Sequence, residues 1–208
     1  MYYFIEPMTE DDIPEVQQIE AKSFSTPWSA STYRREIRNT QSCRYIVARA
    51  SPVPPPPSAA SAAPARRGLF SQLFGALLPR SEGASGAAPI VGYGGLWLTV
   101  EDAHVTTIAV DPAHRGKGVG ELLLNALIDH AYELGGRQIT LEVRVSNTAA
   151  QQLYVKYGFQ PAGKRPRYYT DNGEDALIMW TDSIDTPEYR ARLSELRRLL
   201  FARLQAQT

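Results

Sequence analysis

A cluster of glycines between a strand-like and a helix-like segment places the strongest constraint on how this chain can fold. The segment Ile108–Val110 closes a β-branched run, which Asp111 and Pro112 terminate. Glycines follow at positions 116, 118 and 120, and leucine and alanine then recur at helical spacing between 122 and 131. The sequence thus predicts a strand, a glycine-rich turn and a helix in direct succession.

The chemistry of such a turn suits a ligand that carries phosphates. Glycine lacks a Cβ, so the backbone at Gly116, Gly118 and Gly120 can adopt positive φ and let a ligand approach the main chain. The N–H groups in the first turn of the helix have no partner within the helix and carry the positive end of its dipole. The turn alone leaves two interpretations open, a phosphate site or a tight connection between a strand and a helix.

Composition predicts a single domain. The chain has 208 residues, of which 43% are hydrophobic, and its 22 basic residues equal its 22 acidic ones, which gives no indication of direct nucleic-acid binding. One cysteine, Cys43, excludes an internal disulfide and is interpreted as a buried structural thiol. The start of the chain does not resemble a signal peptide, and no apolar run approaches the ~20 residues of a transmembrane segment. We expect a cytoplasmic protein.

The order of the predicted elements indicates a mixed α/β (α+β) domain. Strands are expected at 2–5, 43–50, 90–98, 104–110, 138–145 and 175–180, with a proline-interrupted strand after 159. Helices are expected at 12–21, 29–37, 120–134 and 148–157. The strands at 104–110 and 138–145 flank a helix, so they should lie parallel, whereas 90–98 and 104–110 should form an antiparallel hairpin.

We place this domain at 1–181. One segment of different composition interrupts it, and another follows it. The segment 51–89 holds eight of the 15 prolines and predicts a low-complexity insertion. A short amphipathic helix is expected within it, formed by Leu69, Phe70, Leu73, Phe74, Leu77 and Leu78. It could dock on its own domain, on a partner or at a membrane surface. The extension 182–208 predicts an amphipathic helix from 187 to 207, which either caps the domain or pairs with another chain.

Two polar residues in the second half of the chain are candidates for catalysis. Glu142 lies in the middle of a strand, on the same face as Thr140 and Arg144. Such a carboxylate is either a base or a member of an ion pair with Arg144 or another neighbour. Tyr154 lies on the following helix, where it either packs on the sheet or acts in catalysis.

The glycine-rich turn and the segments around these residues resemble one family. Arg115-x-x-Gly118-x-Gly120 is similar to the pyrophosphate-binding signature Q/R-x-x-G-x-G/A of the GNAT superfamily of acetyl-CoA-dependent N-acetyltransferases, rather than to G-x-G-x-x-G or to a P-loop. The runs 141–150 and 153–159 resemble the second signature of its ribosomal-protein-alanine N-acetyltransferase subgroup. The segments 27–29, 108–112, 168–169 and 173–176 match that subgroup in order, so the resemblance covers about 1–50 and 90–181.

This resemblance implies a fold and a set of site residues. The fold is a mixed, mostly antiparallel sheet with a central, splayed parallel strand pair, flanked by helices. The implied catalytic residues are Glu142 as general base and Tyr154 as general acid. Tyr168 and Tyr169 are expected at the substrate, and Trp28 either forms a wall of the substrate site or covers the edge of the core. The implied acetyl-CoA contacts are Ile108, Ala109, Val110, Arg115, Gly116, Lys117, Gly118, Val119, Gly120, Glu121 and Asn147.

The chemistry agrees with these roles. A protein α-amine with a pKa of about 7.7–8.0 is partly neutral already, so a carboxylate, acting directly or through water, need remove only one proton. A thiol near pKa ~8.5 and a phenol near ~10 are close enough for Tyr154 to protonate the departing sulfur. No metal is expected, because His104, His114 and His130 are scattered. The expected substrate is a protein N-terminus, that of a ribosomal protein; small amines, lysine side chains and a non-catalytic acetyl-CoA sensor are the alternatives.

Overall fold

Seven strands form one sheet in the computed structural model, which describes residues 1–54 and 88–207. The expected amphipathic helix at Leu69–Leu78 lies outside these residues. The order across the sheet is β1-β2-β3-β4-β5-β7-β6, and every neighbouring pair is antiparallel except β4 with β5. The strands are β1 (Tyr2–Pro7), β2 (Cys43–Ser51), β3 (Ile90–Thr99), β4 (Asp102–Val110), β5 (Gln138–Arg144), β6 (Phe159–Tyr169) and β7 (Glu174–Thr181).

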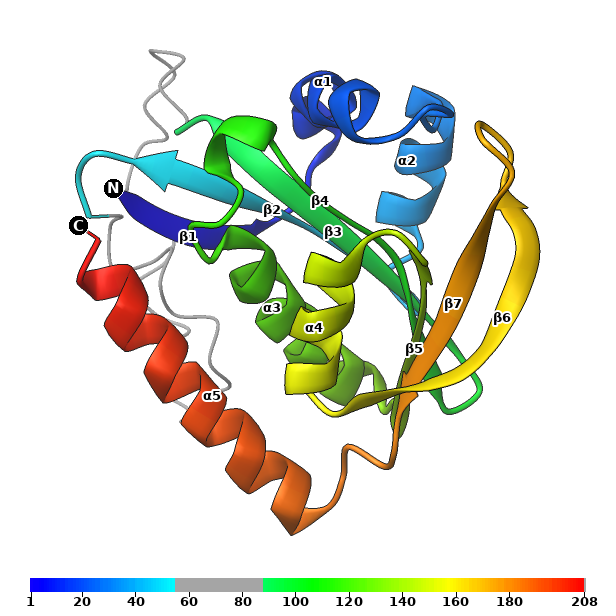
Figure 1. Cartoon of the computed structure of the whole chain (residues 1–208). Helices are drawn as coiled ribbons and strands as arrows, with labels where there is room; N and C mark the ends of the chain where they lie inside the picture. Colours follow the sequence, from blue (N-terminus) through cyan, green and yellow to red (C-terminus); the bar gives the residue numbers. More distant parts are fainter. Residues whose placement is uncertain (55–87, 208) are drawn as a thin grey trace.

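Helices cover both faces of the sheet (Figure 1). In the described residues they are α1 (Ile13–Ser23), α2 (Ala30–Arg38), α3 (Val119–Leu134), α4 (Thr148–Lys156) and α5 (Pro187–Gln205). The Ser29 hydroxyl accepts a hydrogen bond from the Thr32 amide and so caps α2. The helix α3 ends at Gly135, which adopts the left-handed conformation that such a terminus requires.

Two hydrophobic clusters hold these layers together. The larger cluster packs α3 against the sheet and includes Leu123, Leu127 and Ile128, all of which are fully buried. The smaller one packs α1 and α2 against the opposite face and includes Val16 and Tyr33. The helical spacing of the apolar residues therefore marks the faces that are buried.

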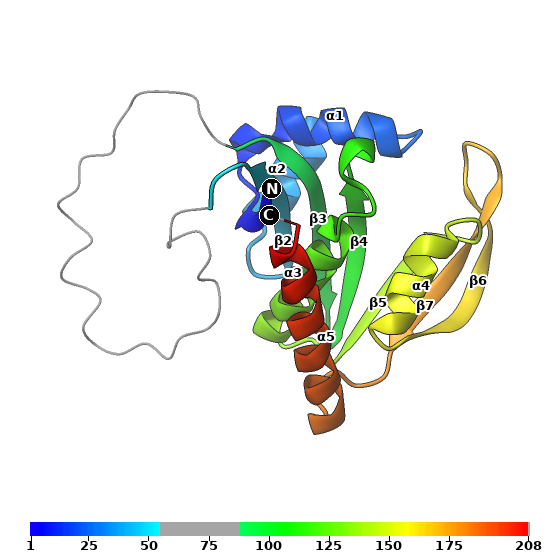
Figure 2. The ribbon, with the colours of Figure 1, turned by 60° about the vertical axis from the view of Figure 1, so that its left-hand side comes forward.

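The parallel pair β4–β5 is splayed, as the family resemblance implies. Its pairing begins at Asp102 with Gln138 and stops at Val105 with Leu141, although both strands continue. The register of β3 with β4 shifts at the same level, so that Thr106 is an extra residue in β4. Such a bulge bends a strand away from its neighbour. Figure 2 shows β5, β7 and β6 diverging from the first four strands, which confirms the predicted fold class.

The C-terminal helix α5 packs on its own domain. Leu193 is buried in the larger cluster, and Leu196 packs against it. Leu200 is also buried, near Gly118 at the start of α3. The side chain of Arg197 binds Asp129 on α3 at 2.6 Å. None of the helices in the described part of the chain combines the length and the apolar composition of a transmembrane segment.

Candidate active site

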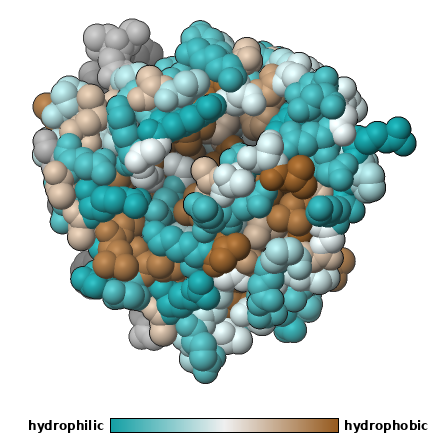
Figure 3. Space-filling view, viewed as in Figure 1, coloured by the Kyte–Doolittle hydropathy of each residue, from teal (hydrophilic) through white to brown (hydrophobic). Residues whose placement is uncertain are grey.

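A cleft of about 740 Å³ opens where β4 and β5 separate. Its walls come from the ends of these strands, from the α1–α2 connection, from α4 and from the β6–β7 hairpin. Glu142, Tyr154, Asn147, Ile108, Trp28, Tyr168 and Tyr169 all line it. Figure 3 shows a hollow on the face viewed in Figure 1, below α1, in which hydrophobic residues are visible among hydrophilic ones. The fold thus brings together candidate residues that are far apart in the sequence.

Glu142 is held between two nitrogen donors. His104 Nε2 lies 3.2 Å from its Oε2, and Arg165 Nη2 lies 3.0 Å from its Oε1. The side chain is 10% exposed. The hydrogen bond from His104 lowers the pKa of the carboxyl and, with the charges of His104 and Arg165, outweighs the opposing effect of burial. Glu142 is therefore ionised near neutral pH and able to accept a proton.

Arg144 is not the ion-pair partner of Glu142. Its guanidinium binds Asp171 at 2.8 Å and Glu174 at 3.1 Å, and it stacks over the ring of Tyr169 at 3.9 Å. Both side chains lie on the same face of β5, but Arg144 extends toward the β6–β7 turn. The alternative in which Arg144 neutralises Glu142 is therefore wrong, and His104 and Arg165 take that place.

Tyr154 projects from α4 into the cleft. The residue is 9% exposed, and its ring packs against Phe159 at a centroid distance of 5.6 Å. Its hydroxyl makes no hydrogen bond to the described part of the chain. Burial raises the pKa of Tyr154. The phenol therefore remains protonated near neutral pH and retains a proton to donate.

Aromatic side chains form the outer part of the cleft. Trp28 lies between α1 and α2 and packs against both Tyr33 and Tyr45, so it belongs to the edge of the core as well as to the wall. Tyr168 and Tyr169 lie at the end of β6, with their ring planes at 89°. Tyr168 is 45% exposed. These rings could contact an extended peptide entering from this side.

The glycine-rich turn has the geometry of an anion cradle. Gly116 and Gly118 have φ values of +74° and +89°, a region that L side chains rarely adopt, and a Cβ on Gly116 would meet nothing within 4 Å. Gly118 directly precedes Val119, the first residue of α3, so the unpaired amides of the first helical turn begin there. The residues present therefore fit a bound phosphate group.

The other candidate cofactor contacts surround this cradle. Arg115 donates from Nε to the Val110 carbonyl at 3.0 Å, and Lys117 is exposed beside the glycines. Beyond Val105, the β4 edge that faces away from β3 has no β5 partner. The backbone groups of Ile108–Val110 that point into the splay, other than the Val110 carbonyl that Arg115 binds, are thus available to a ligand there. Asn147 caps α4 on the other side of the cleft.

Sequence reasoning gave no role in the site to His104, Arg165 or Glu20. His104 and Arg165 reach Glu142 from β4 and β6, and Glu20 lines the cleft from α1. Glu20 is 3% exposed, its Oε2 has no hydrogen-bond partner in the described residues, and burial raises its pKa. The period-two pattern puts His104 on one face of its strand, but only the register of β4 with β5 places it beside Glu142.

Cys43 lies outside the catalytic arrangement. It is buried in the cluster beneath α1 and α2, and its thiol donates a hydrogen bond to Glu36 at 3.3 Å. Burial raises the pKa of this thiol to about 11. Within the residues that the structure describes, no three His, Cys, Asp or Glu side chains are grouped as a metal site would require.

Comparison with known proteins identifies the family. Residues 64–159 match the acetyltransferase (GNAT) family profile. A Bacillus subtilis protein provisionally named a ribosomal protein bS18-alanine N-acetyltransferase is 35% identical over 173 residues, which span 83% of this chain and 91% of that protein. The Mycobacterium tuberculosis N-alpha-acetyltransferase RimI is 43% identical over 107 residues, 50% of this chain and 66% of that protein.

A solved structure shows the same fold. The crystal structure of the ribosomal-protein-S18-alanine N-acetyltransferase from Escherichia coli superposes with a TM-score of 0.63 at 25% sequence identity. The match covers 89% of this chain and 96% of that one.

Proposed function

Because the chain belongs to the GNAT family of acetyltransferases, we propose that it transfers the acetyl group of acetyl-CoA to the N-terminal α-amine of a ribosomal protein, with an N-terminal alanine as the accepted residue. The protein is an acetyl-CoA-dependent N-acetyltransferase. The observation that carries the finer proposal is the cleft itself, in which Glu142 and Tyr154 line one cavity at the splay of β4 and β5.

Acetyl-CoA would be held from both sides of this splay. The amides of Gly116 to Glu121 and the side chains of Arg115 and Lys117 would bind the pyrophosphate. The open edge of β4 at Ile108–Val110 and the side chain of Asn147 would position the pantetheine arm. Free backbone N–H groups in the splay would stabilise the oxyanion that forms at the thioester carbon.

The reaction is a direct transfer. The neutral amine attacks the thioester carbon, the new C–N bond forms, and the amine becomes acidic as it acquires positive charge. Glu142 accepts the released proton, directly or through one water. The C–S bond then breaks with its electron pair on sulfur, and Tyr154 donates its phenolic proton to the thiolate. Trp28, Tyr168 and Tyr169 would hold the first residues of the protein substrate.

Mass spectrometry of a peptide panel tests this assignment. The peptides begin with Ala, Ser or Met, each carries one internal lysine, and a blocked-N-terminus version of each serves as the control. We expect one acetyl group on the α-amine of the Ala-initiated peptide and none on its blocked version. Acetylation confined to the lysine would contradict the α-amine assignment, and binding of acetyl-CoA without any product would favour a non-catalytic acetyl-CoA sensor.

The cytoplasmic location of the protein stays a prediction.

A further inference from the structure

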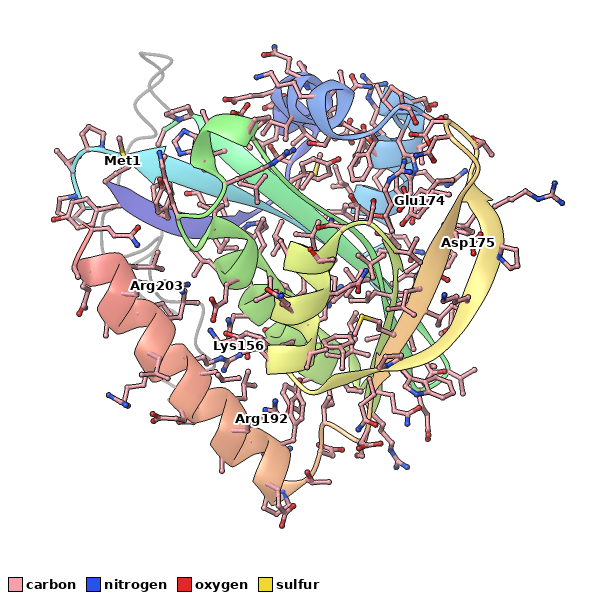
Figure 4. The ribbon with its side chains drawn as sticks, viewed as in Figure 1. Met1, Lys156, Glu174, Asp175, Arg192 and Arg203 are labelled. Carbon is pink, nitrogen blue, oxygen red and sulfur yellow. The ribbon has the colours of Figure 1, made fainter. Side chains whose placement is uncertain are left out.

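The last two turns of α5 lie directly on the glycine-rich turn. A Cβ built on Gly118 would stand 3.1 Å from Arg203 Nη2 and 3.1 Å from Leu204 Cδ2, with Leu200 at 3.5 Å. Figure 4 shows Arg203 on the side of α5 that faces α3, with Lys156 nearby at the end of α4. A helix from the C-terminal extension thus brings a guanidinium to the edge of the proposed pyrophosphate cradle.

The charges at this place do not balance within the residues that the structure describes. Glu121, in the first turn of α3, accepts from Lys156 Nζ at 2.6 Å, from the Tyr157 hydroxyl at 2.8 Å and from Arg203 Nη2 at 2.7 Å. Two cations therefore meet one buried carboxylate. They do so at the N-terminus of a helix, where the dipole disfavours positive charge and favours an anion. An additional bound anion would balance both the surplus charge and the dipole.

Arg203 has hydrogen-bonding capacity to spare. A guanidinium carries five N–H donors, and within the described residues Arg203 uses one of them, in the bond to Glu121. Its side chain is 47% exposed. The planar arrangement of the remaining donors matches the geometry of phosphate oxygens, which arginine often binds through two parallel hydrogen bonds.

We propose that Arg203 is a binding residue for the pyrophosphate of acetyl-CoA, so that the C-terminal helix α5 completes the cofactor site. Lys156 remains as the partner of Glu121 when Arg203 turns part of its guanidinium toward the ligand. This inference rests on the proposed placement of acetyl-CoA at the glycine-rich turn. It assigns a role to the C-terminal extension, in which the helix that buries Leu193 and Leu200 would also bind the cofactor.

Calorimetric titration with three ligands tests the proposal. The ligands are CoA, 3′-dephospho-CoA, which retains the pyrophosphate, and acetyl-pantetheine, which carries no phosphate. The proteins are the parent, Arg203→Gln, Arg203→Lys and Arg198→Gln; Arg198 is exposed on the same helix and pairs with Glu195. Arg203→Gln should bind CoA and 3′-dephospho-CoA about 10-fold or more weakly, the effect of a lost charged hydrogen bond, and acetyl-pantetheine as the parent does. Arg203→Lys should recover part of the loss, and Arg198→Gln should match the parent.

Other patterns would overturn the assignment. Unchanged CoA affinity in Arg203→Gln would show that the residue serves only Glu121, and tighter binding would show that α5 obstructs the cradle. An equal loss for all three ligands would indicate a structural effect. A parent protein that fails to bind CoA at all would instead refute the placement of the cofactor.

A measurement on the unmodified protein gives an independent check, even if Arg203→Gln fails to fold. Hydrogen exchange of the amides at 200–205 should slow when CoA is added, because the ligand would be bound to this part of α5. Faster exchange would mean that CoA displaces the helix, and unchanged exchange would mean that the two do not interact. Either result contradicts the proposal.

Discussion

His104 Nε2 and Glu142 Oε2 lie 3.2 Å apart across the short parallel pairing of β4 and β5. The imidazole is itself fixed, since its Nδ1 lies 2.8 Å from the Thr140 hydroxyl and its ring packs beside Trp97. The hydrogen bond from His104 is the largest contribution to the lowered pKa of Glu142. Together with Arg165, this contact orients the carboxylate of the proposed base and favours its ionised form.

Replacement of His104 by alanine should raise the pKa of Glu142, because the carboxylate loses this donor while Arg165 remains. Carboxyl carbon NMR titration measures this directly. His130→Ala is the matched control, since His130 pairs with Glu133 on the surface of α3 and lies outside the cleft. An unchanged Glu142 titration in His104→Ala would show that the 3.2 Å contact has no electrostatic effect.

Glu142→Gln should lower kcat/KM by about 10²–10⁴-fold, as expected for the loss of a general base, and should leave CoA affinity unchanged. The lowered pKa of Glu142 means that its protonation occurs below the ordinary value of 4.5. The acid limb of kcat/KM should therefore follow the substrate α-amine, near pH ~7.7–8.0, in both parent and variant. An acid limb that persists near this pH in the parent but disappears in Glu142→Gln would contradict this assignment.

Tyr154→Phe should lower the rate by about 10²–10⁴-fold while retaining both the fold and the affinity for CoA. The hydroxyl has no hydrogen-bond partner among the described residues, so its removal leaves no other polar group unpaired. Thermal denaturation measures whether the variant keeps its fold, and calorimetry measures its affinity for CoA, so that both can be distinguished from a change in the rate of turnover. Activity within a few-fold of the parent, in a variant that folds and binds CoA, would exclude Tyr154 as the acid.

Gly118→Ala should weaken CoA binding and also destabilise the protein. Its φ of +89° disfavours a side chain by roughly 1–2 kcal/mol, and the added methyl would meet α5 at 3.1 Å. Gly135→Ala is the matched control, because Gly135 has a φ of +84° and open space around it. The control should lose stability to the backbone effect alone and bind CoA normally. Equal CoA affinity in both variants would mean that the turn at Gly118 is only a connection.

Glu174 should make the stability of the protein depend on pH in the acidic range. It lies at the start of β7 (Figure 4) and accepts hydrogen bonds from the Ser146 amide at 2.7 Å and from Arg144 at 3.1 Å. The bonds to Ser146 and Arg144 lower its pKa from 4.5 to about 2. Its contribution is therefore fully present above pH 4.5 and is lost as the pH falls toward 2.

The measurement for Glu174 compares melting temperatures across this range. Glu174→Gln should melt below the parent at neutral pH, and the difference should shrink as the pH falls from 4.5 toward 2. Glu101→Gln serves as the control, because Glu101 is 57% exposed and its ion pair with Arg137 is long, with 3.6 Å between Oε1 and Nη1. Such an exposed pair contributes little to stability. A difference for Glu174→Gln that does not vary with pH would rule out the linkage.

Local pattern was sufficient to predict the elements that position the site. The glycine-rich turn, the β-branched run before it and the leucines after it are adjacent in the chain, so their chemistry and periodicity predict β4, the turn and α3 without any long-range information. The same holds for the alternation along β5 that puts Glu142 and Arg144 on one face. The family resemblance added the splayed parallel pair, which the structure confirms.

Contacts between distant segments were decided only by the tertiary structure. The sequence left the partner of Glu142 open; the register of β4 with β5 and the path of β6 bring His104 and Arg165 to it, while Arg144 turns to Asp171. Likewise, the spacing in the extension predicts an amphipathic helix but not what it covers. The burial of Leu200 places Arg203 against Gly118, 85 positions earlier in the chain. Periodicity reports which face of an element is buried, whereas register and docking depend on the shapes of two surfaces that meet only in the folded chain.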